Sequence, residues 1–210
     1  GFYDDIMTIA KKLPEKRQNL LFSATMPPKI RELANKLLKN PASISLAISK
    51  PAAGITQIAY MCHDSQKVNL VREILKVKRK DLSHVLIFAS SIKSVREIKR
   101  TLNKSGMRAS EMHSGLEQEQ REQTIREFKS KKIRILVATD ILSRGIDIKG
   151  IELVINYEVP HDAEDYVHRI GRTARADRTG EAITFINPKQ VRNFMDIEEL
   201  IEKEVPKLKL

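Results

Sequence analysis

The stretch that decides the fold is HVLIFASSIKSVREIKRTLNKSGMRASEMHSG, which covers residues 84–115. Its first part, 84–90, is a continuous apolar run that predicts a β-strand covered on both faces. The amphipathic segment that follows carries apolar side chains on one helical stripe, namely Val95, Ile98 and Leu102. Gly106 supplies a stop for that helix, and a second short strand is predicted at 108–113. A strand, a helix and a strand in this order favour parallel strands joined by a right-handed crossover.

The same alternation extends in both directions from this stretch. Strands are predicted at 55–61, 84–90, 108–113, 133–139, 152–158 and 182–186. Helices are predicted between and after them, at 66–78, 94–106, 119–131 and 191–204. The pattern predicts an α/β fold with a parallel sheet flanked by helices, complete within residues 55–210.

The first part of the chain, 1–47, is organised differently. Its pattern predicts a helix, a strand, a helix and a strand, at 3–13, 19–25, 27–39 and 42–47. Such a piece is α/β but too small to bury a sheet alone. The segment ISKPAAG, residues 48–54, is the predicted linker. We therefore expect the remnant of a first domain, a hinge, and a second domain, in a chain cut from a longer protein.

Composition narrows the class of protein. The 210 residues carry a formal net charge of +11, which favours a polyanionic partner such as nucleic acid. Aromatic residues make up 5% and tryptophan is absent, which argues against a base-stacking platform. Cys62 is the single cysteine, so an intramolecular disulfide is excluded and a buried thiol in a reducing, cytoplasmic compartment is expected. No signal peptide, apolar membrane span or metal-ligand spacing is evident, so no metal site is predicted.

Polar clusters follow several of the predicted strands. They are Ser23–Thr25, Ser90–Ser91, His113–Gly115 and Thr139–Asp140. Taken alone, each fits helix capping, and capping is the better interpretation of Ser91. Because ligands of open α/β sheets bind beyond the carboxyl ends of the strands, we expect these clusters to form one polar rim that suits phosphate groups.

The segment ATDILSRGIDIKG, residues 138–150, adds a cation and a carboxylate after a strand. Gly145 allows a sharp turn, so that Arg144 and Asp147 could both face a ligand. A nucleotide offers phosphate to the arginine and ribose hydroxyls to the aspartate. The alternative is a local surface ion pair, which contributes little energy.

The segment YVHRIGRTAR, residues 166–175, places Arg169, Arg172 and Arg175 three residues apart. At helical spacing these cations would share one face and repel one another unless an anion lay among them. Arginine presents a rigid fork of donors that suits phosphate.

These motifs occur in a recognisable order: SAT, LIFASS, HSG followed by QEQR, ATDILSRGIDI and YVHRIGRTAR. In this order they resemble the DEAD-box ATP-dependent RNA helicases of superfamily 2, from Phe2 to about Asn187. The resemblance implies a RecA-like C-terminal domain preceded by the end of the N-terminal RecA-like domain. Ala174 stands where the family usually has Gly, and Ser114–Gly115 where Gly-Asp is usual, but neither change removes a charged contact.

The resemblance implies roles for individual residues. The expected arginine fingers, which are the catalytic residues and reach the γ-phosphate of ATP, are Arg172 and Arg175. The expected contacts to the ribose of ATP are Gly145 and Asp147. Coupling between the two domains is expected from Ser23, Thr25, His168 and Arg169. Contacts to the RNA sugar–phosphate backbone are expected from Ser91, Gln118, Arg121, Thr139 and Arg144.

The sequence lacks other parts of such an enzyme. It contains no Gly-Lys pair of a phosphate loop and no DEAD carboxylates. We expect both in an N-terminal domain that would bind most of ATP and Mg²⁺, so this chain alone should neither hydrolyse ATP nor unwind RNA. Residues 1–47 would dock on their own domain, pair with another chain as a dimer, or lie loose with an exposed strand edge.

Three other functions remain open on the sequence. A non-catalytic RNA- or protein-binding scaffold could use this fold, although it would not need both Arg172 and Arg175. A DNA helicase is disfavoured by the motifs SAT and HRIGRTAR. Nucleophilic catalysis by Ser23 is disfavoured because no G-x-S-x-G elbow surrounds it.

Overall fold

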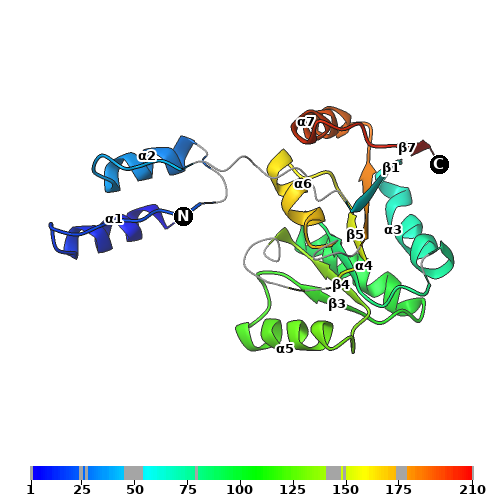
Figure 1. Cartoon of the computed structure of the whole chain (residues 1–210). Helices are drawn as coiled ribbons and strands as arrows, with labels where there is room; N and C mark the ends of the chain where they lie inside the picture. Colours follow the sequence, from blue (N-terminus) through cyan, green and yellow to red (C-terminus); the bar gives the residue numbers. More distant parts are fainter. Residues whose placement is uncertain are drawn as a thin grey trace. The chain divides into compact units, whose positions relative to one another are not determined.

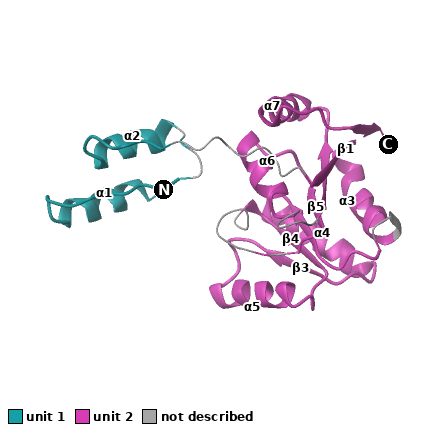
Figure 2. Cartoon of the chain, viewed as in Figure 1, with its two compact units in different colours: residues 1–47 teal, residues 48–210 magenta. Residues whose placement is uncertain are grey.

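The structure is a computed structural model that describes residues 2–23, 26, 28–44, 54–78, 80–140, 148, 150–173 and 179–209. The chain divides into two compact units, residues 1–47 and 48–210 (Figure 2). Residues 48–53 of the predicted linker lie outside the described residues.

Unit 1 contains two helices, α1 (Tyr3–Lys12) and α2 (Pro28–Leu37), which lie side by side (Figure 1). The Lys36 ammonium donates to the Tyr3 hydroxyl at 2.8 Å, so the helices are joined by a side-chain hydrogen bond. The Asn19 amide of the connecting segment donates to the Leu37 carbonyl at 2.7 Å. Both helices predicted in this part of the chain are confirmed.

The strands predicted in unit 1 are wrong for the residues described there, because 19–23 and 42–44 form no strand. A strand leaves its backbone N–H and C=O groups unpaired unless another strand lies beside it, and two short parallel strands do not make a stable sheet. Without a sheet to cover them, several large apolar side chains of this unit are exposed, among them Phe2, Ile9, Leu20, Phe22 and Ile44.

Unit 2 is built on a seven-stranded sheet in which all pairs are parallel and the order is β3-β4-β2-β5-β6-β1-β7. The strands are β1 (Ile55–Met61), β2 (Val85–Phe88), β3 (Ala109–Met112), β4 (Ile135–Ala138), β5 (Leu153–Asn156), β6 (Gly180–Ile186) and β7 (Lys207–Lys209). The six strands predicted in this unit are confirmed. Three of the central strands are buried along their whole length, as continuous apolar runs predict.

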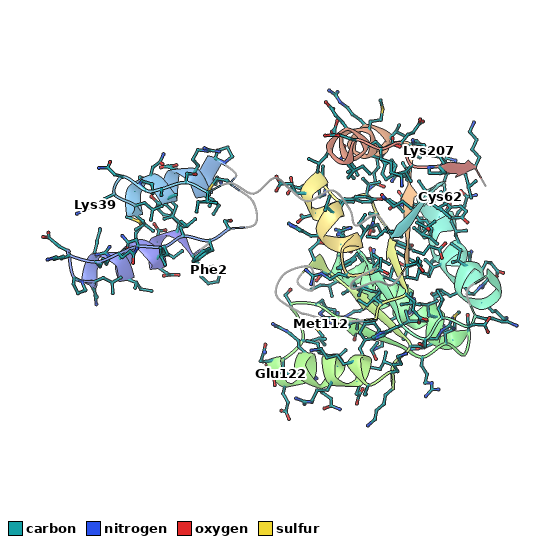
Figure 3. The ribbon with its side chains drawn as sticks, viewed as in Figure 1. Phe2, Lys39, Cys62, Met112, Glu122 and Lys207 are labelled. Carbon is teal, nitrogen blue, oxygen red and sulfur yellow. The ribbon has the colours of Figure 1, made fainter. Side chains whose placement is uncertain are left out.

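Helices cover both faces of the sheet. One face is packed against α3 (Asp64–Glu73), which continues as the π-helix η1 (Ile74–Lys78), and against α4 (Ile92–Lys104). The other face is packed against α5 (Gln118–Lys129), α6 (Ala163–Ile170) and α7 (Val191–Ile201). In Figure 3, Met112 marks the buried side of β3 toward α5, and Glu122 lies on the exposed surface of that helix.

Two elements of unit 2 are absent from the sequence-based assignment. Helix α6 is one of them. Its buried apolar residues, Tyr166, Val167 and Ile170, stand at helical spacing, but the sequence analysis considers only the arginines of this segment. The other is strand β7, which has three exposed residues and pairs with β1 at the sheet edge. No apolar pattern in the sequence therefore predicts it. Two smaller expectations are confirmed: Gly106 ends α4 with φ of 76°, and Cys62 is buried, which raises the pKa of its thiol.

His84 holds three segments of unit 2 together at the end of the sheet away from the strand exits. Its ring is 1% exposed, with Nδ1 at 3.1 Å from the Gly150 carbonyl oxygen and Nε2 at 2.9 Å from the Phe128 carbonyl oxygen. A neutral imidazole has one N–H and can donate to only one of these oxygens at a time. Burial lowers the pKa of His84 and nearby Lys131 adds to this, while the two carbonyls and Glu152 oppose it in part.

This lowered pKa predicts an acid-sensitive fold. A native pKa below the unfolded value means that the stabilisation is present above about pH 6.5 and is lost as the pH falls through the native pKa. The free energy of unfolding, measured with urea between pH 7.5 and 5, should therefore fall more steeply for the natural chain than for His84→Gln. Burial raises the pKa of Glu158, so this residue changes the free energy of unfolding in the opposite direction as the pH falls. It is present in both proteins, so its effect cancels in the comparison. Parallel pH curves would contradict this prediction.

Candidate functional site

Four neighbouring strands end together at one edge of the sheet of unit 2. β3, β4, β2 and β5 are consecutive, and their hydrogen-bond ladder continues one step past the strand ends. The Thr139 N–H donates to the Met112 carbonyl at 3.0 Å, and the Ala89 N–H donates to the Ala138 carbonyl at 2.9 Å. The polar residues that follow these strands, together with those of the first turn of α5 after β3, are called the rim: His113, Gln118, Arg121, Thr139, Asp140, Ser90, Ser91 and Glu158. The predicted rim is thus confirmed for the three strand exits of unit 2.

At the exit of β2 the rim joins α4 to β5. The Ser91 hydroxyl accepts a hydrogen bond from the Ser94 N–H at 3.1 Å, so Ser91 is the N-cap of α4, as expected for this residue alone. The Ser90 N–H donates to the Glu158 carboxylate at 3.0 Å. Burial raises the pKa of Glu158, and the bond from Ser90 opposes that shift. Ser91 itself is exposed and can still meet a ligand.

At the exit of β3 the rim joins the first turn of α5. The His113 ring is fully buried, and its Nδ1 accepts from the Gly115 N–H at 3.2 Å. Arg121 donates from Nε to the Leu116 carbonyl at 2.9 Å and from Nη2 to the Ser114 carbonyl at 3.1 Å. A guanidinium has five N–H donors, so Arg121 fixes this turn and retains donors for a further acceptor.

Gln118 and Thr139 are the other two described residues that are predicted to contact RNA. Gln118 is exposed in the first turn of α5, where its amide donates to Glu122 at 3.0 Å. Thr139 is half-buried one step beyond β4. Together with Ser91 and Arg121 they lie at the same edge of the sheet. The structure therefore brings together four of the five residues assigned to the RNA backbone.

Arg169 is buried beneath the rim. Its guanidinium binds Asp140 through two parallel hydrogen bonds of 2.7 and 2.8 Å, and its side chain is only 4% exposed. The same group donates to the Asn156 side chain at 3.3 Å and lies 5.2 Å from the centre of the Phe88 ring. These contacts tie α6 to the ends of β2, β4 and β5. They all lie within unit 2, and the coupling role assigned to Arg169 stays a prediction.

Arg169 and Arg172 do not share one helical face, contrary to expectation, and Arg175 lies outside the described residues. Helix α6 ends at Ile170, because the chain leaves the helix at Gly171, and Arg172 lies in the turn that follows. A Cβ at Gly171 would stand 2.9 Å from the Val167 carbonyl oxygen, which explains the glycine. The anion that neutralises Arg169 is Asp140 of the same unit, so the charge of this arginine is already balanced without a ligand.

Several predicted site residues lie outside the described residues: Thr25, Arg144, Gly145, Asp147 and Arg175. His168 is half-buried on α6, Arg172 is half-buried just beyond it, and Ser23 is exposed in unit 1. The described part of the chain holds no group of three His, Cys, Asp or Glu side chains that could bind a metal ion. It also holds no helix with the length and apolar character needed to span a bilayer.

The fold agrees with the relatives of this chain. Residues 66–177 match the family described as Helicase conserved C-terminal domain. The chain belongs to this family. This helicase C-terminal domain is 40% identical, over 99% of the chain, to the ATP-dependent RNA helicase CshA of Listeria monocytogenes. It is 36% identical over its full length to the DEAD-box ATP-dependent RNA helicase CshA of Bacillus subtilis.

Two solved structures have a similar fold. A DEAD box protein from Methanococcus jannaschii is 38% identical over the whole chain, with a TM-score of 0.69, and the match covers 56% of that protein. Dbp5 of S. cerevisiae bound to RNA and ADP BeF3 is 28% identical over 98% of the chain, with a TM-score of 0.85. The likeness to DEAD-box RNA helicases inferred from the motifs is therefore confirmed, as is the RecA-like parallel sheet. The chain spans about 40% of the length of the two curated relatives named above.

Proposed function

We propose that this chain is the C-terminal half of an ATP-dependent RNA helicase, which supplies arginine fingers, ribose contacts and RNA-backbone contacts for duplex unwinding. The observation that carries the proposal is the rim, where Ser91, Thr139, Gln118 and Arg121 lie along one edge of the sheet. Hydroxyl, amide and guanidinium groups at helix N-termini suit phosphate and ribose oxygens. The curated relatives, which are named as ATP-dependent RNA helicases, support the same activity.

We propose that nucleotide chemistry requires a second domain. ATP and Mg²⁺ would be bound mainly by an N-terminal RecA-like domain, because the described residues contain no cluster of metal ligands and the sequence contains no Gly-Lys pair. This chain would supply Arg172 and Arg175 to the γ-phosphate and Asp147 to the ribose. By itself the 210-residue chain would hydrolyse no ATP. Its compartment would be the cytoplasm.

RNA binding by the rim should be measurable with this chain alone. Gln118→Ala is expected to weaken binding of a fluorescent single-stranded RNA about fivefold, because one hydrogen bond to the backbone is lost. Arg121→Ala should weaken it by about tenfold or more, because a charge-assisted bond is lost. Anisotropy titrations at low salt give both values, and binding should not depend on base sequence.

The matched control is Gln123→Ala, which removes the same amide from an exposed position further along α5. It should leave the affinity unchanged. If Gln118→Ala and Arg121→Ala bound RNA as tightly as the natural chain, the assignment of the rim to RNA would be wrong.

A further inference from the structure

A basic groove runs between α4 and the edge strand β3, away from the rim residues assigned above. It has a volume of about 510 Å³, and its lining residues are Arg96, Lys99, Arg100, Asn103, Lys104 and Glu111. Only one of these six side chains, Glu111, is acidic, and it accepts a hydrogen bond from Lys99 at 3.2 Å. A second hollow of about 210 Å³ follows, lined by Gly106, Met107, Arg108, Lys131, Lys132 and Arg134.

Most cations of the groove are not neutralised by the residues that the structure describes. Arg96, Arg100 and Lys104 are exposed and follow one another at four-residue spacing, so they are neighbours on one side of α4. No hydrogen bond or ion pair joins these three side chains to any other described residue. Like charges at this spacing destabilise a helix. An external anion would remove that repulsion.

Helix α4 is far more positive than α7 on the opposite face of the sheet. Segment 92–104 contains five Lys or Arg residues and one acid, Glu97. Segment 191–204, which forms α7 and its end on the opposite face of the sheet, contains five acids and two basic residues. A polyanion is therefore attracted to the surface of α4 more strongly than to that of α7.

The groove lies along the same helix that has its N-cap, Ser91, in the rim. Helix α4 begins at Ser91 in the rim, and its thirteen residues extend about 20 Å toward the opposite end of the sheet. β3 contacts α4 from the sheet, with Arg108 before its first residue and His113 of the rim after its last. A chain of phosphates that leaves the rim beside Ser91 would meet the cations of α4 in succession.

We propose that the groove between α4 and β3 is a second RNA contact, which holds the sugar–phosphate backbone of the strand after it leaves the rim. The proposal rests on the proposed function for the identity of the strand. The lining favours a nucleic acid over an acidic protein, because Met107 is the single large apolar residue among the twelve that line the two hollows. Protein interfaces are centred on apolar and aromatic anchors, whereas backbone contacts to RNA need only cations and polar groups.

The test compares two double variants of equal charge. Arg100→Gln with Lys104→Gln removes two cations from the groove, and Arg192→Gln with Lys203→Gln removes two exposed cations from α7 and its end. Each is titrated with polyuridine of about eight and about twenty nucleotides. The groove variant should bind the longer RNA about tenfold more weakly, and its slope of log affinity against log salt should be smaller by about 1.4. The short RNA and the α7 variant should show less than a twofold change.

Other outcomes overturn the proposal. Equal losses for both variants would show a diffuse charge effect, and no loss for the groove variant would show that RNA does not enter it. If polyaspartate of matched charge bound the groove as tightly as the long RNA, the surface would belong to an acidic protein. If the groove variant lost affinity for the long RNA while Gln118→Ala bound RNA normally, the result would support the groove as an RNA contact and contradict the assignment of the rim to RNA. If the natural chain bound neither RNA, both proposals would fail.

Discussion

Replacing Arg172 by alanine in the full-length helicase that we propose is expected to lower ATP turnover by roughly 10³- to 10⁵-fold, the effect of an arginine finger in nucleotide-hydrolysing enzymes. Arg172 lies in the turn directly after α6, where it is half-buried. The finger stabilises charge that develops in the transition state, so kcat should fall far more than nucleotide affinity. Steady-state ATPase assays at saturating RNA, with nucleotide binding measured separately, test this.

Three controls make that result specific. Arg172→Lys should recover little activity, because an ammonium does not reproduce the rigid fork of donors. Arg192→Ala, an exposed arginine on α7, should keep normal turnover. The 210-residue chain alone should give the background rate. Turnover near normal in a folded Arg172→Ala enzyme would contradict the finger assignment.

The largest loss of stability is expected at Asp140. Asp140→Ala removes the carboxylate that faces the buried guanidinium of Arg169 and leaves that charge without its main partner. Breaking a fully buried pair costs about 3–5 kcal/mol. Since the Asp140 side chain is 46% exposed, we expect about 2–3 kcal/mol in the free energy of unfolding by urea.

A double variant distinguishes this account from a simple loss of packing. Arg169→Met added to Asp140→Ala removes the unpaired charge and should be more stable than Asp140→Ala alone. Asp140→Asn, which keeps one acceptor, should lose less stability than the alanine variant. A double variant that lost the sum of both single effects would mean that the charge of Arg169 is well tolerated without its partner.

The sequence predicted the sheet of unit 2 well because each buried strand is a short apolar run between amphipathic segments. It predicted the helices of unit 1 correctly but its strands wrongly, for a physical reason. A run such as 19–25 has the composition of a strand, but a strand forms only where a partner lies beside it, and composition does not report the partner. The prediction missed β7 for the opposite reason: this strand has a partner, β1, but lacks the apolar composition of a strand.

The rim was predictable, whereas the network below it was not. Polar residues after strands locate the rim, because parallel strands end at one edge. The pairing of Arg169 with Asp140 joins residues 29 positions apart, and it depends on β2, β4 and β5 being neighbours, an order that no local pattern contains. The same holds for the groove. The cations of α4 are visible at four-residue spacing, but the strand order places β3 at the edge beside them.

The position of β1 in the sheet has a consequence for biosynthesis. β1 pairs only with β6 and β7 among the described strands, and the first residue of β6, Gly180, lies far along the chain from Met61 at the end of β1. During synthesis on the ribosome, β1 has no partner among the described strands until β6, which begins at Gly180, has been translated. Closure of this side of the sheet is thus a late, non-local event. Until then β1 is an unpaired strand of the nascent chain, which is prone to aggregation.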